Sequence, residues 1–269
     1  MSLSHSPLGK VTTSPNRYDS SVLFRISREV QRRTLPTCTS PMDGVDILNC
    51  YELSWLNASN KPEVRIAEIL IPASSEFLIE SKSLKMYFNS FNNTVFKDQL
   101  TVERHIIEDL SQTSGTSVLV KLKSVSTQYF PEELQGVVID DTEIDVELDK
   151  IATNALATSD EYVEEALISH LFRSTCPVTG QPDWGSILVV YKGNKITRDG
   201  LLKYLISFRS HSAFHENCIE RIFVDIMNSC EPQILSVYGR FTRRGGIDIN
   251  PFRTTHNRFK PHNIRLLRQ

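Results

Sequence analysis

A cysteine and a carboxylate lie close together in a proline-containing stretch in the second half of the chain. Asp183 follows Cys176 by seven residues, and Pro177 and Pro182 lie between them. Proline fixes its own φ angle and restricts the preceding residue to extended geometry, so this stretch is stiff. A thiol and an acid held at a set distance are the groups that nucleophilic catalysis by cysteine requires. A buried structural cysteine beside a surface turn is the alternative interpretation.

Polar residues elsewhere are candidates to assist this thiol or to bind a substrate. A free thiol is only a few per cent thiolate at neutral pH, so Cys176 needs a base, and Asp183 and His215 are the candidates. Glu80 and Glu216 each lie at the start of a predicted helix, where a carboxylate is favoured in any case. A carboxylate also accepts two parallel N–H bonds from an edge like that of guanine.

Two basic clusters have the composition of phosphate-binding sites. Lys82 and Lys85 are three residues apart on one predicted helical face, and Arg243-Arg-Gly-Gly246 combines charge with flexible backbone. Each cluster can equally be a solvated surface. The sequence contains no GxGxxG motif after a strand, so it does not support a Rossmann domain, and its histidines lack the spacing of metal ligands.

Length and composition limit the class of protein. The 269 residues correspond to one large domain or two of ordinary size, and the net charge of −2 gives no overall field that would attract nucleic acid. The N-terminal sequence predicts no signal peptide, and no apolar run is long enough to span a membrane, so we expect a cytoplasmic protein. The five cysteines form no CxxC pair, which indicates a reducing compartment without a disulfide framework.

The apolar pattern of the first half predicts a mixed arrangement of strands and helices. We expect an arm over residues 1–46 with a short helix near 20–33, strands over 51–56 and 64–71, helices over 80–91 and 100–110, and a strand over 117–122. Residues 140–149 contain six acids and are predicted to be an edge strand or a connector.

The second half is predicted to begin with a helix. Thr158 and Glu161 have the spacing of a capping box, and Val163, Leu167 and Leu171 would share one helical face. Such a helix would end at the Cys176 loop, and the negative end of its dipole would raise the pKa of that thiol. Further expected elements are a strand over 187–191, helices over 201–206 and 218–226, and a strand over 236–242.

A degenerate repeat relates the two halves. Tyr87-x-x-Ser90-Phe91 in the first half matches Tyr204-x-x-Ser207-Phe208 in the second, and each is followed by another phenylalanine and an amphipathic helix. The first half carries the Glu80 and Lys82 cluster, which the second half lacks. Cys176 and Asp183 occur only in the second half. We therefore expect one site that receives residues from both halves.

These motifs together resemble the QueF nitrile reductase family in its two-module form, from about Tyr51 to the C-terminus. The resemblance is carried by Glu80-Ser-Lys-Ser-Leu-Lys-Met-Tyr87, Cys176-Pro-Val-Thr-Gly-Gln-Pro-Asp-Trp184, Ser207-Phe-Arg209, Phe214-His-Glu216 and Arg243-Arg-Gly-Gly-Ile-Asp-Ile-Asn-Pro251. It implies an α+β chain of tandem T-fold (tunnelling fold) modules, which are antiparallel sheets each with a pair of helices. The implied divisions are an arm (1–46), a first module (47–138), a connector (139–157) and a second module (158–269).

The resemblance also implies an activity and residue roles. It implies NADPH-dependent reduction of the nitrile of 7-cyano-7-deazaguanine to 7-aminomethyl-7-deazaguanine, in the queuosine pathway of tRNA modification, through a thioimide on Cys176. Asp183 would transfer the proton, with His215 as a further catalytic residue. The implied substrate contacts are Ile79, Glu80, Ser81, Phe214, His215 and Glu216, and the implied NADPH contacts are Ser81, Lys82, Arg244 and Gly245. At least a homodimer is implied, with no direct nucleic-acid or membrane partner and no metal.

Two other classes of function stay open at this point. One is a T-fold purine or pterin enzyme of the GTP cyclohydrolase type, whose chemistry needs a metal. The other is a non-catalytic binding module that contacts RNA through its basic C-terminal region, where residues 237–269 contain eight Lys or Arg against one acid.

Overall fold

The computed structural model describes residues 15–126, 130–145, 150–256 and 260–269. The chain forms two compact units. Unit 1 consists of Met1–Gln31, Asp46–Tyr129 and Arg243–Ile249, and unit 2 of Arg32–Val45, Phe130–Thr242 and Asn250–Gln269. Residues 243–249 thus pack with the first unit, although the residues on both sides of them in sequence belong to the second. The module limits of 47–138 and 158–269 stay a prediction.

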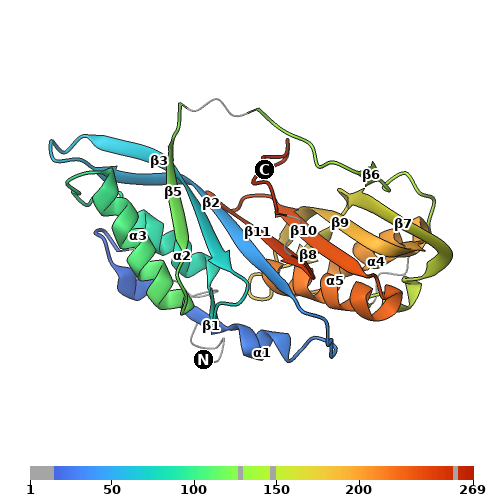
Figure 1. The fold of residues 1–269 in the computed structure, drawn as a ribbon. Helices are drawn as coiled ribbons and strands as arrows, with labels where there is room; N and C mark the ends of the chain where they lie inside the picture. The colour runs from blue at the N-terminus through green and yellow to red at the C-terminus, as the bar shows by residue number, and fades with distance from the viewer. Residues whose placement is uncertain (1–14, 127–129, 146–149, 257–259) are drawn as a thin grey trace. The chain divides into compact units, whose positions relative to one another are not determined.

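Unit 1 is an antiparallel sheet with two helices packed on one face (Figure 1). Its main strands occur in the order β5-β3-β2, and a turn in which Asn57 N–H donates to Lys61 O joins β2 to β3. The elements are η2 (Ser20–Val22), β1 (Arg25–Ser27), α1 (Arg28–Arg32), β2 (Asp43–Leu56), β3 (Pro62–Pro72), β4 (Phe77–Ile79), α2 (Ser81–Ser90), α3 (Gln99–Ser114) and β5 (Leu119–Ser124).

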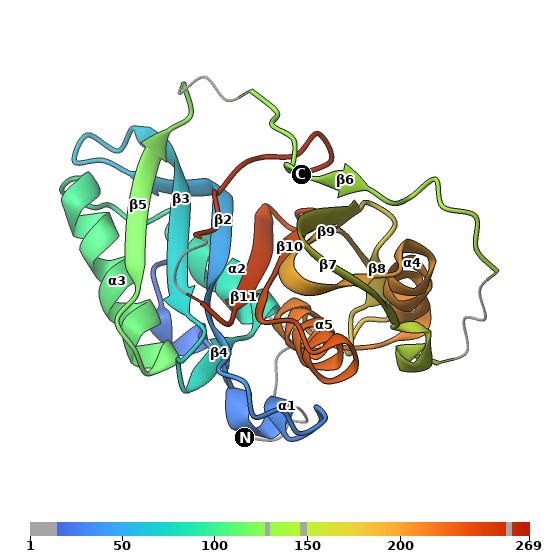
Figure 2. The same ribbon diagram turned by 45° about the vertical axis from the view of Figure 1, so that its right-hand side comes forward.

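Unit 2 repeats this arrangement, with α4 and α5 along one face of its sheet (Figure 2). Its strand order is β11-β10-β9-β7-β6, and β8 pairs with β9 outside that path. The elements are β6 (Val137–Val138), η3 (Thr153–Ala155), β7 (Thr158–Ser169), β8 (Arg173–Thr175), β9 (Pro182–Ile196), α4 (Arg198–Ile206), η4 (Ser207–Ser210), α5 (His215–Cys230), β10 (Ile234–Phe241) and β11 (Ile247–Thr254).

The α+β class and the pairing of antiparallel sheets with two helices each are confirmed. The predicted helices over 80–91, 100–110, 201–206 and 218–226 are present as α2, α3, α4 and α5. The described part of the predicted arm contains η2, β1 and α1 in place of one short helix. Residues 140–145 form no strand, and the remainder of the acidic stretch, 146–149, lies outside the described residues, as do arm residues 1–14.

The helix predicted after Thr158 is wrong. Residues 158–169 form strand β7, which pairs antiparallel with β9 from Thr158↔Ile196 to Ser169↔Ile187. Val163 and Leu167 are four residues apart, which is one helical turn but also an even number, so they share a face in a strand as well. Cys176 therefore follows strand β8 and not the C-terminus of a helix, so the expected helix dipole does not act on it.

The corrected strand makes the internal repeat regular. Both units now share the order strand, strand, helix, helix, strand, as β2, β3, α2, α3 and β5 in unit 1 and β7, β9, α4, α5 and β10 in unit 2, and the other elements lie outside this repeat. Tyr87 OH donates to Asp109 Oδ2 at 2.6 Å in unit 1, and Tyr204 OH donates to Asp225 Oδ2 at 2.8 Å in unit 2. The serine three residues after each tyrosine donates to that tyrosine's carbonyl at 2.6 Å. The repeated motif thus joins the two helices of each unit in the same way.

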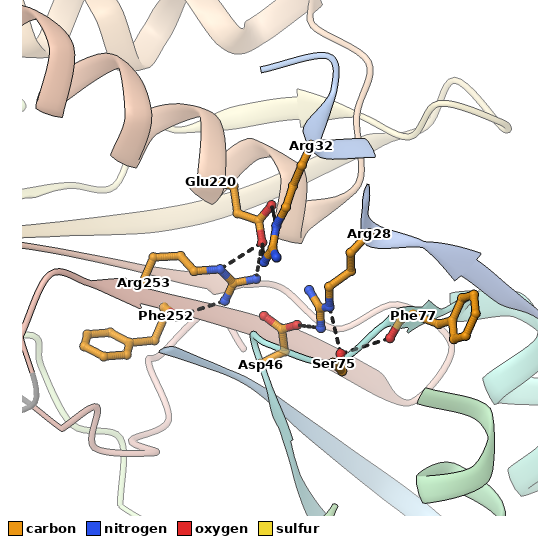
Figure 3. Close-up of polar contacts among 8 residues, drawn as sticks. All are labelled: Arg28, Arg32, Asp46, Ser75, Phe77, Glu220, Phe252 and Arg253. Carbon is orange, nitrogen blue, oxygen red and sulfur yellow. Dashed lines mark hydrogen bonds and ion pairs between the residues drawn. The ribbon is translucent and has the colours of Figure 1, made fainter. Parts of the chain in front are cut away.

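A buried carboxylate on α5 is held by two arginines (Figure 3). Glu220 accepts from Arg32 Nη2 at 2.7 Å and Nε at 3.0 Å, and from Arg253 Nη2 at 2.8 Å and Nε at 3.0 Å. The side chain of Glu220 is 4% exposed and that of Arg253 is fully buried. Bidentate arginine pairs are directional, so this contact fixes the first turns of α5, which begins at His215.

Replacing Glu220 by alanine should lower the free energy of unfolding by about 3–5 kcal/mol, because it leaves the buried Arg253 guanidinium without its carboxylate. Chemical denaturation of the two proteins measures the difference. Glu161→Ala is the control, because Glu161 pairs with Lys195 at 2.7 Å with both side chains largely in solvent, and it should cost less than about 1 kcal/mol. Equal small losses in both variants would contradict a structural role for the arginine pair.

Candidate active site

A tight hairpin positions the thiol and the carboxylate singled out by the sequence. Strands β8 and β9 pair with Ser174 opposite Asp183, and Cys176 N–H continues the ladder by donating to Gln181 O at 2.9 Å. Gly180, at φ +67°, donates to Cys176 O and closes the turn. The stiffness expected from the prolines is therefore reinforced by backbone hydrogen bonds across the loop.

The register of this hairpin places Cys176 and Asp183 on one face. Side chains of directly paired residues share a face, and so does the residue two positions further along the strand. Cys176 lies two residues after Ser174, the partner of Asp183, so the two are diagonal neighbours with Cα atoms about 7–8 Å apart. Both are buried, at 4% and 7% exposure.

Backbone pairing brings His215 to the same hairpin. Thr175 N–H donates to His211 O at 2.9 Å, and Ala213 N–H donates to Thr175 O at 3.2 Å. Helix α5 starts two residues later, and His215 Nε2 lies 3.4 Å from Asp183 Oδ2. This separation exceeds a normal hydrogen bond, but such contacts commonly tighten when a substrate binds. The thiol, the carboxylate and the imidazole are thus gathered within unit 2.

The neighbours of His215 begin helix α5. Phe214 is the half-buried N-cap residue and supplies no capping side chain, whereas Glu216 lies buried in the first turn, where the helix dipole favours a carboxylate. Burial raises the pKa of Cys218, further along α5, to about 12 and that of Cys230 to about 11. Cys218 and Cys230 are therefore protonated at neutral pH and unreactive.

Glu80 is the N-cap of α2 in unit 1. Its Oε1 accepts from Lys82 N–H at 2.6 Å and its Oε2 from Ser83 N–H at 2.8 Å, and the residue is 1% exposed. Burial raises the pKa of this carboxyl group, an effect that the two backbone bonds oppose. The helix-start interpretation is therefore correct. A carboxylate has about four acceptor positions, so capping leaves capacity for a ligand. Ile79 ends β4 and Ser81 begins α2, on either side of it.

The predicted basic clusters of unit 1 meet at a glycine turn. Gly245 and Gly246 have φ angles of +63° and +76°, and a Cβ at Gly245 would lie 2.9 Å from Lys85 Cδ. Lys85 is one turn after Lys82 on α2. The turn carrying Arg244 therefore lies against the helix that carries the lysines, and glycine provides both the left-handed backbone and the space.

An aromatic contact of His215 was not predicted. The ring of Phe241, at the end of β10, lies parallel to the imidazole with centroids 4.0 Å apart and an interplanar angle of 9°. The sequence shows Phe241 only as one apolar residue of a predicted strand.

In the described part of the chain, no group of three or more His, Cys, Asp or Glu residues is arranged to hold a metal ion.

A repeated strand-strand-helix-helix-strand module whose second copy gathers Cys176, Asp183 and His215 is the architecture of a tandem T-fold enzyme. Two family models match the chain: "Nitrile reductase, 7-cyano-7-deazaguanine-reductase N-term" over residues 14–122, and "QueF-like protein" over residues 182–260. The chain belongs to this nitrile reductase family.

Similar proteins cover the chain almost completely. A protein of Desulfotalea psychrophila is 48% identical over 98% of this chain and 97% of its own length, and one of Burkholderia mallei is 46% identical over the whole of both. Both are named NADPH-dependent 7-cyano-7-deazaguanine reductase. A solved structure of the archaeosine synthase QueF-Like in its apo form matches 36% of this chain and 97% of its own, with a TM-score of 0.32 and 16% identity.

A membrane-spanning helix was not expected. Among the described helices, none combines the length and the apolar character needed to cross a bilayer.

Proposed function

We propose that this protein catalyses NADPH-dependent reduction of the nitrile of 7-cyano-7-deazaguanine to 7-aminomethyl-7-deazaguanine, through a thioimide on Cys176. The observation that supports it best is the placement of Cys176 and Asp183 as diagonal neighbours on one hairpin, with His215 Nε2 3.4 Å from Asp183 Oδ2. The near-complete match to relatives named for this reaction supports the substrate and the cofactor.

The first step joins the sulfur of Cys176 to the nitrile carbon. The thiol loses its proton to Asp183 as the C–S bond forms, and one π bond of the nitrile breaks. The nitrile nitrogen gains the electron pair, and Asp183 returns the proton to it. One carboxyl group therefore acts as base and then as acid, and atoms and charge balance without a further reactant. His215 stabilises the ionised carboxylate before the first transfer and after the second.

Glu80 and Glu216 each have the chemistry to bind a deazaguanine. Its 2-amino and ring N–H groups form a donor edge that fits a carboxylate in a bidentate manner. Glu216 is buried beside His215, and Glu80 retains acceptor positions after capping α2. We assign the neighbouring residues Ile79, Ser81 and Phe214 to further contacts with the deazaguanine. Burial makes each such hydrogen bond costly to leave unmade and so favours the correct base.

The residues of unit 1 fit the proposed cofactor. The side chains of Lys82 and Arg244 and the hydroxyl of Ser81 are suited to phosphate and sugar groups, and Gly245 presents exposed backbone beside them. The reduction of one nitrile to an amine takes two hydrides, which NADPH supplies when bound. The burial of Cys176 and Asp183 protects the half-reduced imine from water until the second hydride arrives.

The stoichiometry of the reaction tests this proposal. Purified protein supplied with a limiting amount of the nitrile should oxidise two NADPH per nitrile consumed, and the product should be the primary amine by mass spectrometry. A mixture with the amine in place of the nitrile should oxidise none. Metal-dependent turnover of a purine nucleotide, or salt-sensitive RNA binding without NADPH consumption, would contradict the proposal in favour of the other two classes.

We further propose a cytoplasmic homodimer with no direct nucleic-acid or membrane partner.

A further inference from the structure

The imidazole of His215 has contacts that fix its plane without a second polar partner. Histidine orientation is usually set by a hydrogen bond at the nitrogen that is not used in the chemistry. Here Nε2 faces Asp183, and Nδ1 is buried and has no hydrogen-bond partner among the described residues. The phenyl ring of Phe241 covers one face of the imidazole and lies parallel to it, with the ring centroids 4.0 Å apart. The χ2 torsion of histidine is intrinsically broad, so this face-to-face contact restricts it.

The phenyl ring of Phe241 is itself closely confined. Phe241 is fully buried, and its backbone pairs with Gly185 on β9. A Cβ at Gly185 would lie 3.2 Å from Phe241 Cδ1, and one at Gly239 would lie 2.9 Å from Phe241 Cε2. The absence of a side chain at Gly185 and Gly239 therefore leaves the space that the phenyl ring occupies. Phe172 meets the ring edge-on, with centroids 5.8 Å apart.

The backbone of Phe241 is held by two buried amide side chains. Phe241 N–H donates to Asn250 Oδ1 at 3.1 Å, and Gln269 Nε2 donates to Phe241 O at 2.8 Å. Gln269 Nε2 also donates to Asn250 Oδ1 at 2.9 Å, and Arg240 Nε donates to Gln269 Oε1 at 3.0 Å. This closed network of satisfied groups fixes the position from which the phenyl ring projects.

We propose that Phe241 is a positioning residue for His215: its ring holds the imidazole plane so that Nε2 is directed at Asp183. Asn250 and Gln269 support it by fixing the Phe241 backbone. The inference rests on the proposed role of His215 in the nitrile reduction. Phe241 acts through the histidine and has no proton of its own to give.

A double-mutant cycle tests this role. Phe241→Leu keeps an apolar side chain but removes the flat face, and it should lower kcat about a hundredfold with little change in KM, as a misdirected catalytic group does. In a His215→Ala background the same substitution should cause little further loss, because the group that it orients is absent. Phe208→Leu is the matched control: that ring is also fully buried and packs on Phe172 and Tyr204, and its effect should be the same in both backgrounds.

A spectroscopic measurement tests the contact independently of turnover. With ¹³C-labelled histidine, the ring signal assigned to His215 by its loss in His215→Ala should move downfield in Phe241→Leu, because the shielding of the phenyl face is removed. It should not move in Phe208→Leu. An unmoved signal, an unchanged kcat, or equal losses with and without His215 would each overturn the inference. Wild-type protein without nitrile reduction would contradict the proposed function, and the signal shift would still decide whether Phe241 orients the ring.

Discussion

Cys176→Ala should abolish nitrile reduction while the protein still binds the nitrile. In the proposed mechanism the thiol forms the bond to the nitrile carbon, and removing a nucleophile typically lowers kcat by at least about a thousandfold. The proposal assigns binding of the deazaguanine to other residues, so the dissociation constant measured by calorimetry should change little. Wild-type protein mixed with the nitrile before NADPH is added should show a new absorbance from the thioimide, and the variant should show none.

Cys230→Ala is the control for this experiment. Cys230 is a buried thiol of the same unit, near the end of α5, and burial raises its pKa to about 11. Its loss removes a similar volume without removing a reactive group, so kcat and the absorbance change should persist. A Cys176→Ala variant that retains more than a tenth of wild-type turnover would exclude covalent catalysis by this sulfur.

Asp183→Asn should lower kcat by about 10²–10⁴-fold, the range for removal of a general acid–base group. The amide has nearly the same shape as the carboxyl group, but it cannot take the thiol proton and deliver it to the nitrile nitrogen. The absorbance of the thioimide should therefore appear slowly in the variant after mixing. Stopped-flow mixing of enzyme and nitrile measures that rate separately from hydride transfer.

Asp225→Asn separates catalysis from folding. Asp225 is also a buried carboxylate of unit 2, and it accepts from Tyr204 OH at 2.8 Å and Arg221 Nε at 2.7 Å. Its substitution should lower the free energy of unfolding but leave kcat per folded molecule close to the wild-type value. If both aspartate variants slowed turnover equally, the effect of Asp183→Asn would be structural, and the proton-transfer role would fail.

The local backbone around the candidate site residues was easier to predict than the pairing of the elements around them. The Cys176–Asp183 stretch was recognisable because its prolines restrict the backbone locally, and the structure adds the β8–β9 ladder. The helix start at Glu80 followed from local rules as well, and both carboxylate oxygens cap α2. Local signals of this kind depend only on residues that are close in sequence, so a single sequence is enough to show them.

The errors arose where long-range pairing decides the structure. In β7, a capping-box spacing and a four-residue apolar interval were compatible with a helix, and only the ladder with β9 selects the strand. Strand β11 was not predicted, because Asp248, Asn250 and Arg253 interrupt its apolar pattern. All three are buried, and Arg253 is paired with Glu220, 33 residues away in sequence. Phe241 was missed for the same reason, because its stacking partner comes from another element.

The matching tyrosine–aspartate bonds of the two units have a consequence for how such a chain can change over time. Tyr87 with Asp109 and Tyr204 with Asp225 join the helices of each unit, whereas the candidate nucleophile Cys176 lies outside this contact. In unit 2 the contact between the helices and the candidate reactive thiol therefore depend on separate residues. After a duplication, a copy could lose reactive groups and still keep its fold, so the two copies could specialise.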